Sequence, residues 1–134
     1  MKLFTPEEAN EALETVRALT EELVRQRRRL ERRRAELAAV RAKVAGNGGD
    51  FDTSEVSEAQ TEADEALAGV ESAIAALDEL GVQVKDLDRG LIDFPALHPA
   101  EGAVVLLCWR LGEDEVRFWH GVVDGFAGRK PLPF

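Results

Sequence analysis

Apolar residues recur every seven positions along the first third of this chain, and this spacing restricts the fold more than any other feature. The row consists of Val16, Leu23, Leu30, Leu37 and Val44. Residues seven apart lie on one side of an α-helix, so the pattern predicts a single helix over about residues 6–45. At 1.5 Å per residue such a helix is about 60 Å long.

The start of this helix is marked by the sequence Thr5-Pro6-Glu7-Glu8. Thr5 can cap the helix, Pro6 suits its first position, and Glu8 can reach back to the Thr5 amide to complete a capping box. We therefore expect the helix to begin at Pro6.

A second helix is predicted over about residues 53–80. Gly46 to Asp50 provide residues that favour a turn, Asp52 can cap the helix with Glu55 three positions later, and Gly81 is suited to end it. Its apolar rows are Val56, Ala63, Val70 and Leu77, with Leu67 and Ile74 beside them. A long helix, a turn and another long helix predict an antiparallel hairpin.

The charges of the two helices are complementary. Residues 1–46 hold eleven Lys and Arg and eight Asp and Glu, whereas residues 47–80 hold ten Asp and Glu and no Lys or Arg. A hairpin that turns near residue 49 places Arg28 to Arg34 opposite roughly Asp64 to Val70. The basic and acidic stretches should therefore meet.

Beyond Gly81 the spacing changes to the alternation of β-strands, over about residues 82–123. A strand at Leu91–Phe94 should end at Pro95, and Ala103–Trp109 is apolar on both faces, which predicts a central strand with one face covered by the helices. The tail over residues 124–134 is rich in Gly and Pro, so we expect it to be irregular. The fold class is α+β: one domain over residues 1–134, with a long antiparallel two-helix hairpin followed by a small antiparallel sheet of three to four strands.

Composition excludes several classes of protein. The net charge is −9, which argues against a surface that attracts nucleic acid as a whole. Cys108 is the only cysteine, the first residues lack the zones of a secretory signal, and no apolar run approaches the roughly 20 residues that span a bilayer. We expect a cytoplasmic protein with no role in a membrane.

The sequence Arg25 to Arg34 contains seven arginines. Arginine is well suited to bind phosphate, so an RNA or acidic-partner contact is one interpretation. However, these positions point all round a helix, and an acidic helix is predicted alongside. We therefore favour a solvated surface with interhelical ion pairs.

Metal-binding side chains occur in the strand region, at Asp93, Cys108, Glu113 and His120. None of the usual metal motifs is present, and pairing Ala103–Leu111 with Glu115–His120 sets Cys108 and His120 several residues out of register. Joint ligation by these two residues is therefore not expected, and a divalent metal is a minor alternative, at Asp93, Glu113 and His120. Cys108 lies in an apolar strand where burial raises a thiol pKa, so no catalytic residue is predicted and an enzyme is not expected.

Trp109 and Trp119 have two interpretations. They can close the sheet against the helices and the tail, or they can form a binding surface together with His120 and Arg129.

Five segments of the chain, taken together, resemble the motifs of a known family. They are Phe4-Thr5-Pro6-Glu7-Glu8-Ala9-Asn10, Gly90-Leu91-Ile92-Asp93-Phe94-Pro95-Ala96, Leu107-Cys108-Trp109-Arg110-Leu111-Gly112-Glu113, Trp119-His120 and Gly125-Phe126-Ala127-Gly128-Arg129. Through them the whole chain resembles the bacterial and archaeal proteins of domain-of-unknown-function family 2203. The resemblance implies no activity, cofactor or partner. It does imply one motif set, which forms our candidate binding patch: Asp93, Trp109, Glu113, Trp119, His120 and Arg129.

The sequence thus leads to three hypotheses of function. The first is a non-catalytic binding or assembly module, in which the hairpin engages a protein partner or a second copy because its seam is too long for a short sheet to cover. The second is a metal-dependent or small-molecule-binding activity at Asp93, Glu113 and His120. The third is RNA or acidic-partner contact through Arg25–Arg34, although nucleic acid is not the expected partner.

Overall fold

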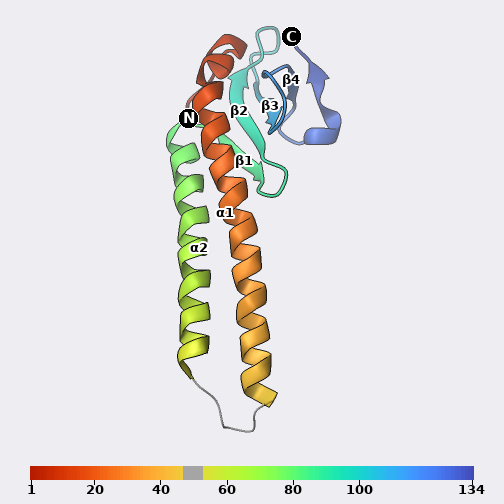
Figure 1. Cartoon of the computed structure of the whole chain (residues 1–134). Coiled ribbons are helices and arrows are strands. Elements are labelled where there is room, and N and C mark those ends of the chain that lie inside the picture. The colour runs from red at the N-terminus through yellow and green to blue at the C-terminus, as the bar shows by residue number, and fades with distance from the viewer. Residues whose placement is uncertain (47–52) are drawn as a thin grey trace.

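In the computed structural model, which describes residues 1–46 and 53–134, the chain forms a long helical hairpin with a sheet packed at one end (Figure 1). Helix α1 spans Pro6–Gly46 and helix α2 spans Thr53–Glu79. The capping box is confirmed: the Thr5 amide donates to Glu8 Oε1 at 3.0 Å, and the Glu8 amide donates to Thr5 Oγ1 at 3.1 Å. Gly81 follows α2 with a φ of +89°, in the left-handed region that glycine tolerates. The expected turn at residues 47–50 and the cap at Asp52 lie outside the described residues.

The two helices bury their apolar rows against each other. Leu30 and Leu37 of α1 and Ala63, Ala66 and Val70 of α2 are all buried. The end of the hairpin near residues 46 and 53 extends well beyond the sheet (Figure 1). Most of the seam is therefore covered by the facing helix, whereas Val44 and Val56 at its far end are only partly buried.

The expected pairing of basic and acidic side chains is confirmed. Arg29 lies 3.8 Å from Glu65, Arg33 lies 3.5 Å from Glu62, and Lys43 lies 3.4 Å from Glu55. These side chains are partly exposed, so each pair is worth only about 0–1 kcal/mol.

The sheet contains five antiparallel strands in the order β1-β2-β3-β4-β5. Their bounds are β1 Gln83–Asp86, β2 Leu91–Leu97, β3 Val104–Arg110, β4 Phe118–His120 and β5 Lys130–Pro131. The short 3₁₀ helix η1, Phe126–Gly128, lies between β4 and β5. As expected, β3 is central. The sheet has one strand more than the expected maximum, because the tail is not wholly irregular: Lys130 and Pro131 pair with Trp119 and Phe118.

Strand β2 does not end at Pro95, contrary to our expectation. Pro95 pairs with Leu106 of β3, and its carbonyl oxygen accepts a hydrogen bond from the Phe4 amide at 2.7 Å on the opposite edge of β2. In an antiparallel strand the N–H and C=O of one residue point the same way. The N–H that proline lacks would therefore point to that outer edge, away from β3, so the ladder to β3 loses nothing.

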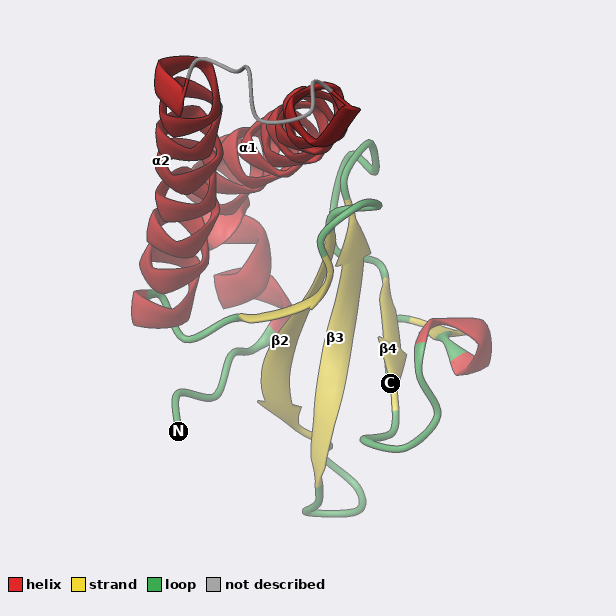
Figure 2. Cartoon of the chain, turned by 90° about the horizontal axis from the view of Figure 1, so that it is seen from below, coloured by secondary structure: helices red, strands yellow, loops and turns green. Residues whose placement is uncertain are grey.

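The helices cover one face of the sheet (Figure 2). Ile92, Phe94, Leu107 and Trp109 belong to the same apolar core as the helix residues Val16 and Leu77. Side chains alternate along a strand, so the intervening residues of β2, β3 and β4 face away from the helices. We call this second surface the outer face.

Candidate functional site

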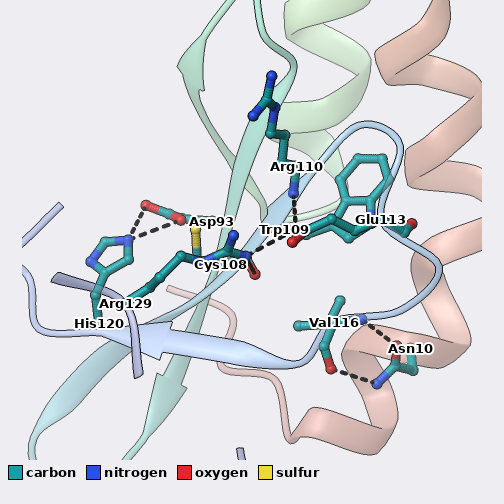
Figure 3. A network of polar contacts seen from close by, with 9 residues as sticks. All are labelled: Asn10, Asp93, Cys108, Trp109, Arg110, Glu113, Val116, His120 and Arg129. Carbon is teal, nitrogen blue, oxygen red and sulfur yellow. Dashed lines mark hydrogen bonds and ion pairs between the residues drawn. The ribbon is translucent and has the colours of Figure 1, made fainter. Parts of the chain in front are cut away.

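Three polar side chains lie together on the outer face, one from each of three neighbouring strands (Figure 3). Asp93 of β2 is directly opposite Cys108 of β3. His120 of β4 is opposite Leu106, two residues along β3 from Cys108. We call Asp93, Cys108 and His120 the outer-face triad. Its three residues are only 2–3% exposed, although two of them are ionisable at neutral pH in water.

The triad is compact. His120 Nε2 lies 3.2 Å from both carboxylate oxygens of Asp93. One ligand atom from each of Asp93, Cys108 and His120 can be chosen so that all three lie within 4.8 Å of one another. Zinc with bonds of 2.0–2.3 Å in a tetrahedron separates its ligand atoms by roughly 3.3–3.6 Å. His120 Nε2 and the Asp93 oxygens already have about this spacing, and the most widely separated pair would have to approach by up to about 1 Å to share such an ion.

The imidazole of His120 is held in one orientation. Its Nδ1 lies 2.7 Å from the carbonyl oxygen of Gly121, and a carbonyl can only accept, so Nδ1 carries a proton and donates. In the neutral ring Nε2 then presents a lone pair to the Asp93 carboxylate. Two acceptors at 3.2 Å repel each other, so either a proton or a metal ion has to lie between them. A ring N–H donated to a backbone carbonyl is the usual second contact of a histidine that binds metal.

Burial changes the acidity of the other two groups. Loss of hydration raises the pKa of Asp93, and the neighbouring His120 and Lys85 only partly oppose this increase. Burial, together with the nearby Asp93 carboxylate, raises the pKa of the Cys108 thiol to about 12. Without a cation, Cys108 is therefore a neutral thiol that donates to Asp93. A divalent ion would stabilise both anionic forms.

The expectation that Cys108 and His120 lie too far apart for joint ligation is wrong. The observed offset is two residues, because Cys108 pairs with Phe118 and Leu106 pairs with His120. An offset of two residues keeps both side chains on the same face, and such diagonal neighbours are within reach of a long side chain. The offset therefore brings the thiol and the imidazole together.

Glu113 and Arg129 form a second polar group beside the triad. Arg129 donates from Nη2 to Glu113 Oε1 at 2.9 Å and to the Cys108 carbonyl oxygen at 3.2 Å. Its guanidinium lies 4.0 Å from the ring centre of Phe118 and 4.4 Å from that of Phe126. Glu113 Oε1 also accepts from the Arg110 amide at 2.7 Å, and Glu113 is not among the residues whose possible ligand atoms converge at the triad. The third possible metal ligand beside Asp93 and His120 is therefore Cys108, and not Glu113 as the sequence had suggested.

The two tryptophans of the candidate patch belong to the other face of the sheet. Trp109 is fully buried in the core, and its Nε1 donates to the Glu113 carbonyl oxygen at 3.1 Å. Trp119 packs against the same core and contacts His98 and Phe134. The six candidate residues therefore do not share one surface: Asp93 and His120 lie on the outer face, Glu113 and Arg129 at its end, and both tryptophans on the helix side.

A cavity of about 190 Å³ adjoins the triad. It is lined by Lys85, Leu91, Asp93, Leu106, Cys108, His120, Val122, Val123, Gly125 and Phe126. Its walls are apolar apart from the triad and Lys85. Sequence analysis missed Lys85, Val122 and Val123. The available signal was a pair of adjacent valines in the glycine-flanked segment Gly121-Val122-Val123-Asp124-Gly125, and in the structure these valines are 63% and 94% exposed.

The family model described as uncharacterized conserved protein (DUF2203) matches residues 2–132 of the chain. This match confirms the resemblance drawn from the motifs. No curated protein and no solved structure matches the chain. Among the described residues, no helix is both long and apolar enough to cross a membrane.

Proposed function

This chain belongs to the DUF2203 family, and we propose that it binds one divalent metal ion through Asp93, Cys108 and His120 and leaves one coordination position open to a ligand. The observation that carries the proposal is the convergence of the three ligand atoms within 4.8 Å on a buried face.

The donor set favours zinc. A thiolate sulfur, an imidazole nitrogen and a carboxylate oxygen together match zinc better than magnesium or calcium, which prefer oxygen. With two anionic ligands and one neutral imidazole, the bound ion brings the net charge of the site close to zero. A site with almost no net charge can be buried away from water at little cost, as the triad is. Three protein ligands are typical of zinc sites that keep one position for water or substrate, whereas structural zinc sites usually have four.

The lone cysteine also bears on location. A buried thiol that must stay reduced in order to bind metal suits a reducing compartment, so we place the protein in the cytoplasm.

Metal analysis of the purified protein tests the proposal. Protein prepared without an affinity tag that binds metal, and without chelator, should contain about one equivalent of zinc. The cobalt-substituted protein should show a thiolate-to-cobalt charge-transfer band, because Cys108 is a ligand. Cys108→Ser and His120→Gln should each lose most of the metal and the band.

His98→Gln is the matched control, because His98 is the other histidine and lies outside the triad. Its Nδ1 accepts from the amides of Ala100 and Glu101 at 3.2 Å, a role that a glutamine oxygen can take over. This variant should retain metal. Wild-type protein that takes up no zinc and forms no thiolate band with cobalt would show that the triad is only a hydrogen-bonded structural cluster.

Assembly through the hairpin, the first hypothesis drawn from the sequence, has less support. Within the described residues of the hairpin, Leu30 and Leu37 are buried and are not available to a second copy. Sedimentation at high protein concentration tests this alternative, and a concentration-dependent dimer would restore it. RNA contact through Arg25–Arg34 is likewise weakened, because Arg29 and Arg33 pair with Glu65 and Glu62.

A further inference from the structure

The cavity beside the triad has the features of a site for a small organic acid. Asp93, Cys108 and His120 all line it, so an ion that they hold borders the cavity, and the fourth coordination position has this space available. We infer that the ligand of the proposed metal site is a short-chain aliphatic monocarboxylate, bound with its carboxylate toward the ion and its chain in the cavity. This inference rests on the proposed function.

The walls favour an aliphatic chain. Leu91 and Leu106 form the part of the cavity that belongs to the sheet, and Val122, Val123 and Phe126 form the part that follows β4. Val122 and Val123 are largely exposed, and a chain in the cavity would cover apolar surface that water now contacts. A phosphate ion would gain nothing from such walls. The nearby guanidinium of Arg129 would not bind it, because Arg129 is already paired with Glu113.

The charge favours an anion. Among the described residues that line the cavity, Lys85 is the one Lys or Arg side chain, and Asp93 lines the same cavity. Lys85 has no ion-pair partner among residues 1–46 and 53–134. Lys85 lies at the irregularity in the pairing of β1 with β2, between Val84 opposite Ile92 and Asp86 opposite Leu91, and from there it reaches the cavity. A ligand carboxylate beside the ion would therefore have a second positive charge nearby.

The volume limits the ligand to a few carbons. About 190 Å³ corresponds to the liquid volume of roughly six water molecules, well below the roughly 300–1,000 Å³ of pockets for drug-sized ligands. On the same liquid-volume scale acetate leaves a large part of this space empty, whereas butyrate and pentanoate approach its capacity. Longer chains have to extend into solvent past Val123.

Titration of the cobalt-substituted protein tests the inference, because the visible cobalt bands report a change at the fourth coordination position. The probes are acetate, propionate, butyrate and octanoate, with inorganic phosphate as the contrasting anion. From acetate to butyrate the affinity should rise about fourfold for each added methylene. Octanoate should gain far less per methylene, and phosphate should bind more weakly than butyrate.

Lys85→Gln should weaken butyrate binding about fivefold without loss of cobalt. Lys130→Gln is the matched control, because Lys130 is an exposed lysine that lies over the Trp119 ring instead of the cavity, and it should bind butyrate like the wild type. Cobalt bands that form normally but do not respond to any carboxylate would overturn the inference and leave the metal site standing. Equal affinity for acetate and butyrate would also overturn it. Failure to form the thiolate band would instead overturn the metal site itself, and the inference with it.

Discussion

Replacement of Asp93 by asparagine should separate a metal site from a structural hydrogen-bonded cluster. The asparagine amide has the same shape as the carboxylate, is neutral at every pH, and can donate an N–H to the Nε2 lone pair of His120. In the metal-free protein it supplies the hydrogen that has to lie between the two side chains. Its oxygen can still accept from the Cys108 thiol. The hydrogen bonds of the metal-free site should therefore survive, whereas an anionic metal ligand is lost.

The sign of the effect on stability follows from the raised pKa of Asp93. A carboxyl group with a higher pKa in the folded chain contributes stability below its unfolded pKa of about 4 and loses that contribution as pH rises through the folded pKa. At pH 7.5, well above the unfolded pKa, Asp93 therefore lowers the stability of the metal-free fold. Asp93→Asn removes this destabilisation, so the free energy of unfolding in the presence of a chelator should stay within about 1 kcal/mol of wild type or increase.

Zinc should reverse the ranking. At a free zinc concentration of 100 times Kd, wild type should gain about 2.7 kcal/mol, which for a chain of this size is an increase in Tm of about 10 °C. Asp93→Asn should gain only a small part of this. The assay is thermal unfolding of both proteins at pH 7.5, once with chelator and once with buffered zinc.

Two results would refute this reasoning. A loss of 3 kcal/mol or more by Asp93→Asn in chelator would mean that the carboxylate stabilises a buried imidazolium, as expected for a purely structural pair. An equal zinc-induced rise in Tm for the two proteins would mean that Asp93 is not a ligand.

Three further predictions concern the fold. Asn10 exchanges two hydrogen bonds with the buried backbone of Val116, at 2.8 and 3.3 Å, so Asn10→Ala should cost about 2–4 kcal/mol in urea unfolding, and a cost below 1 kcal/mol would contradict this account. Replacement of both Glu62 and Glu65 by Gln should cost at most about 2 kcal/mol, and 1 M salt should shrink the difference from wild type, as thermal melts can check. The backbone amides of Arg89 and Asp88 lower the pKa of Asp86, so its contribution to stability is present above pH 4 and lost as pH falls below it; Asp86→Asn should make unfolding less pH-dependent between pH 2 and 4.

The helices were predictable from the sequence because a single physical rule governs them. Residues seven apart must share one side of a helix, so the rows through Leu30 and Val70 specified both the elements and the faces that they bury. The capping box at Thr5 and the pairing of Arg33 with Glu62 followed from local chemistry and from the antiparallel arrangement. These features depend on the types of residues and on their spacing along the chain, and both can be read directly from the sequence.

The outer-face triad was harder to predict because β2 and β3 are buried on both faces. A strand with one solvated face alternates between apolar and polar residues, and this alternation shows which residues point the same way. Leu91–Ala96 and Val105–Trp109 are buried throughout and give no such signal. The pairing of Asp93 with Cys108 depends on the length of the loop between the strands, and no pattern in the sequence reports that register.

The character of the outer face is the strongest physical reason to regard the triad as functional. Leu91 and Leu106 are its neighbours, and aliphatic side chains at Asp93, Cys108 and His120 would satisfy the same face without a buried carboxylate or an imidazole that needs a partner. A chain under selection for stability alone has no reason to hold a carboxylate whose pKa burial raises and a thiol whose pKa reaches about 12 within the same few ångströms. Departures of this kind from local preference concentrate at sites that bind or react. A metal ion is the one ligand that would make all three residues favourable together, since it removes the thiol proton, neutralises the carboxylate and accepts the imidazole lone pair.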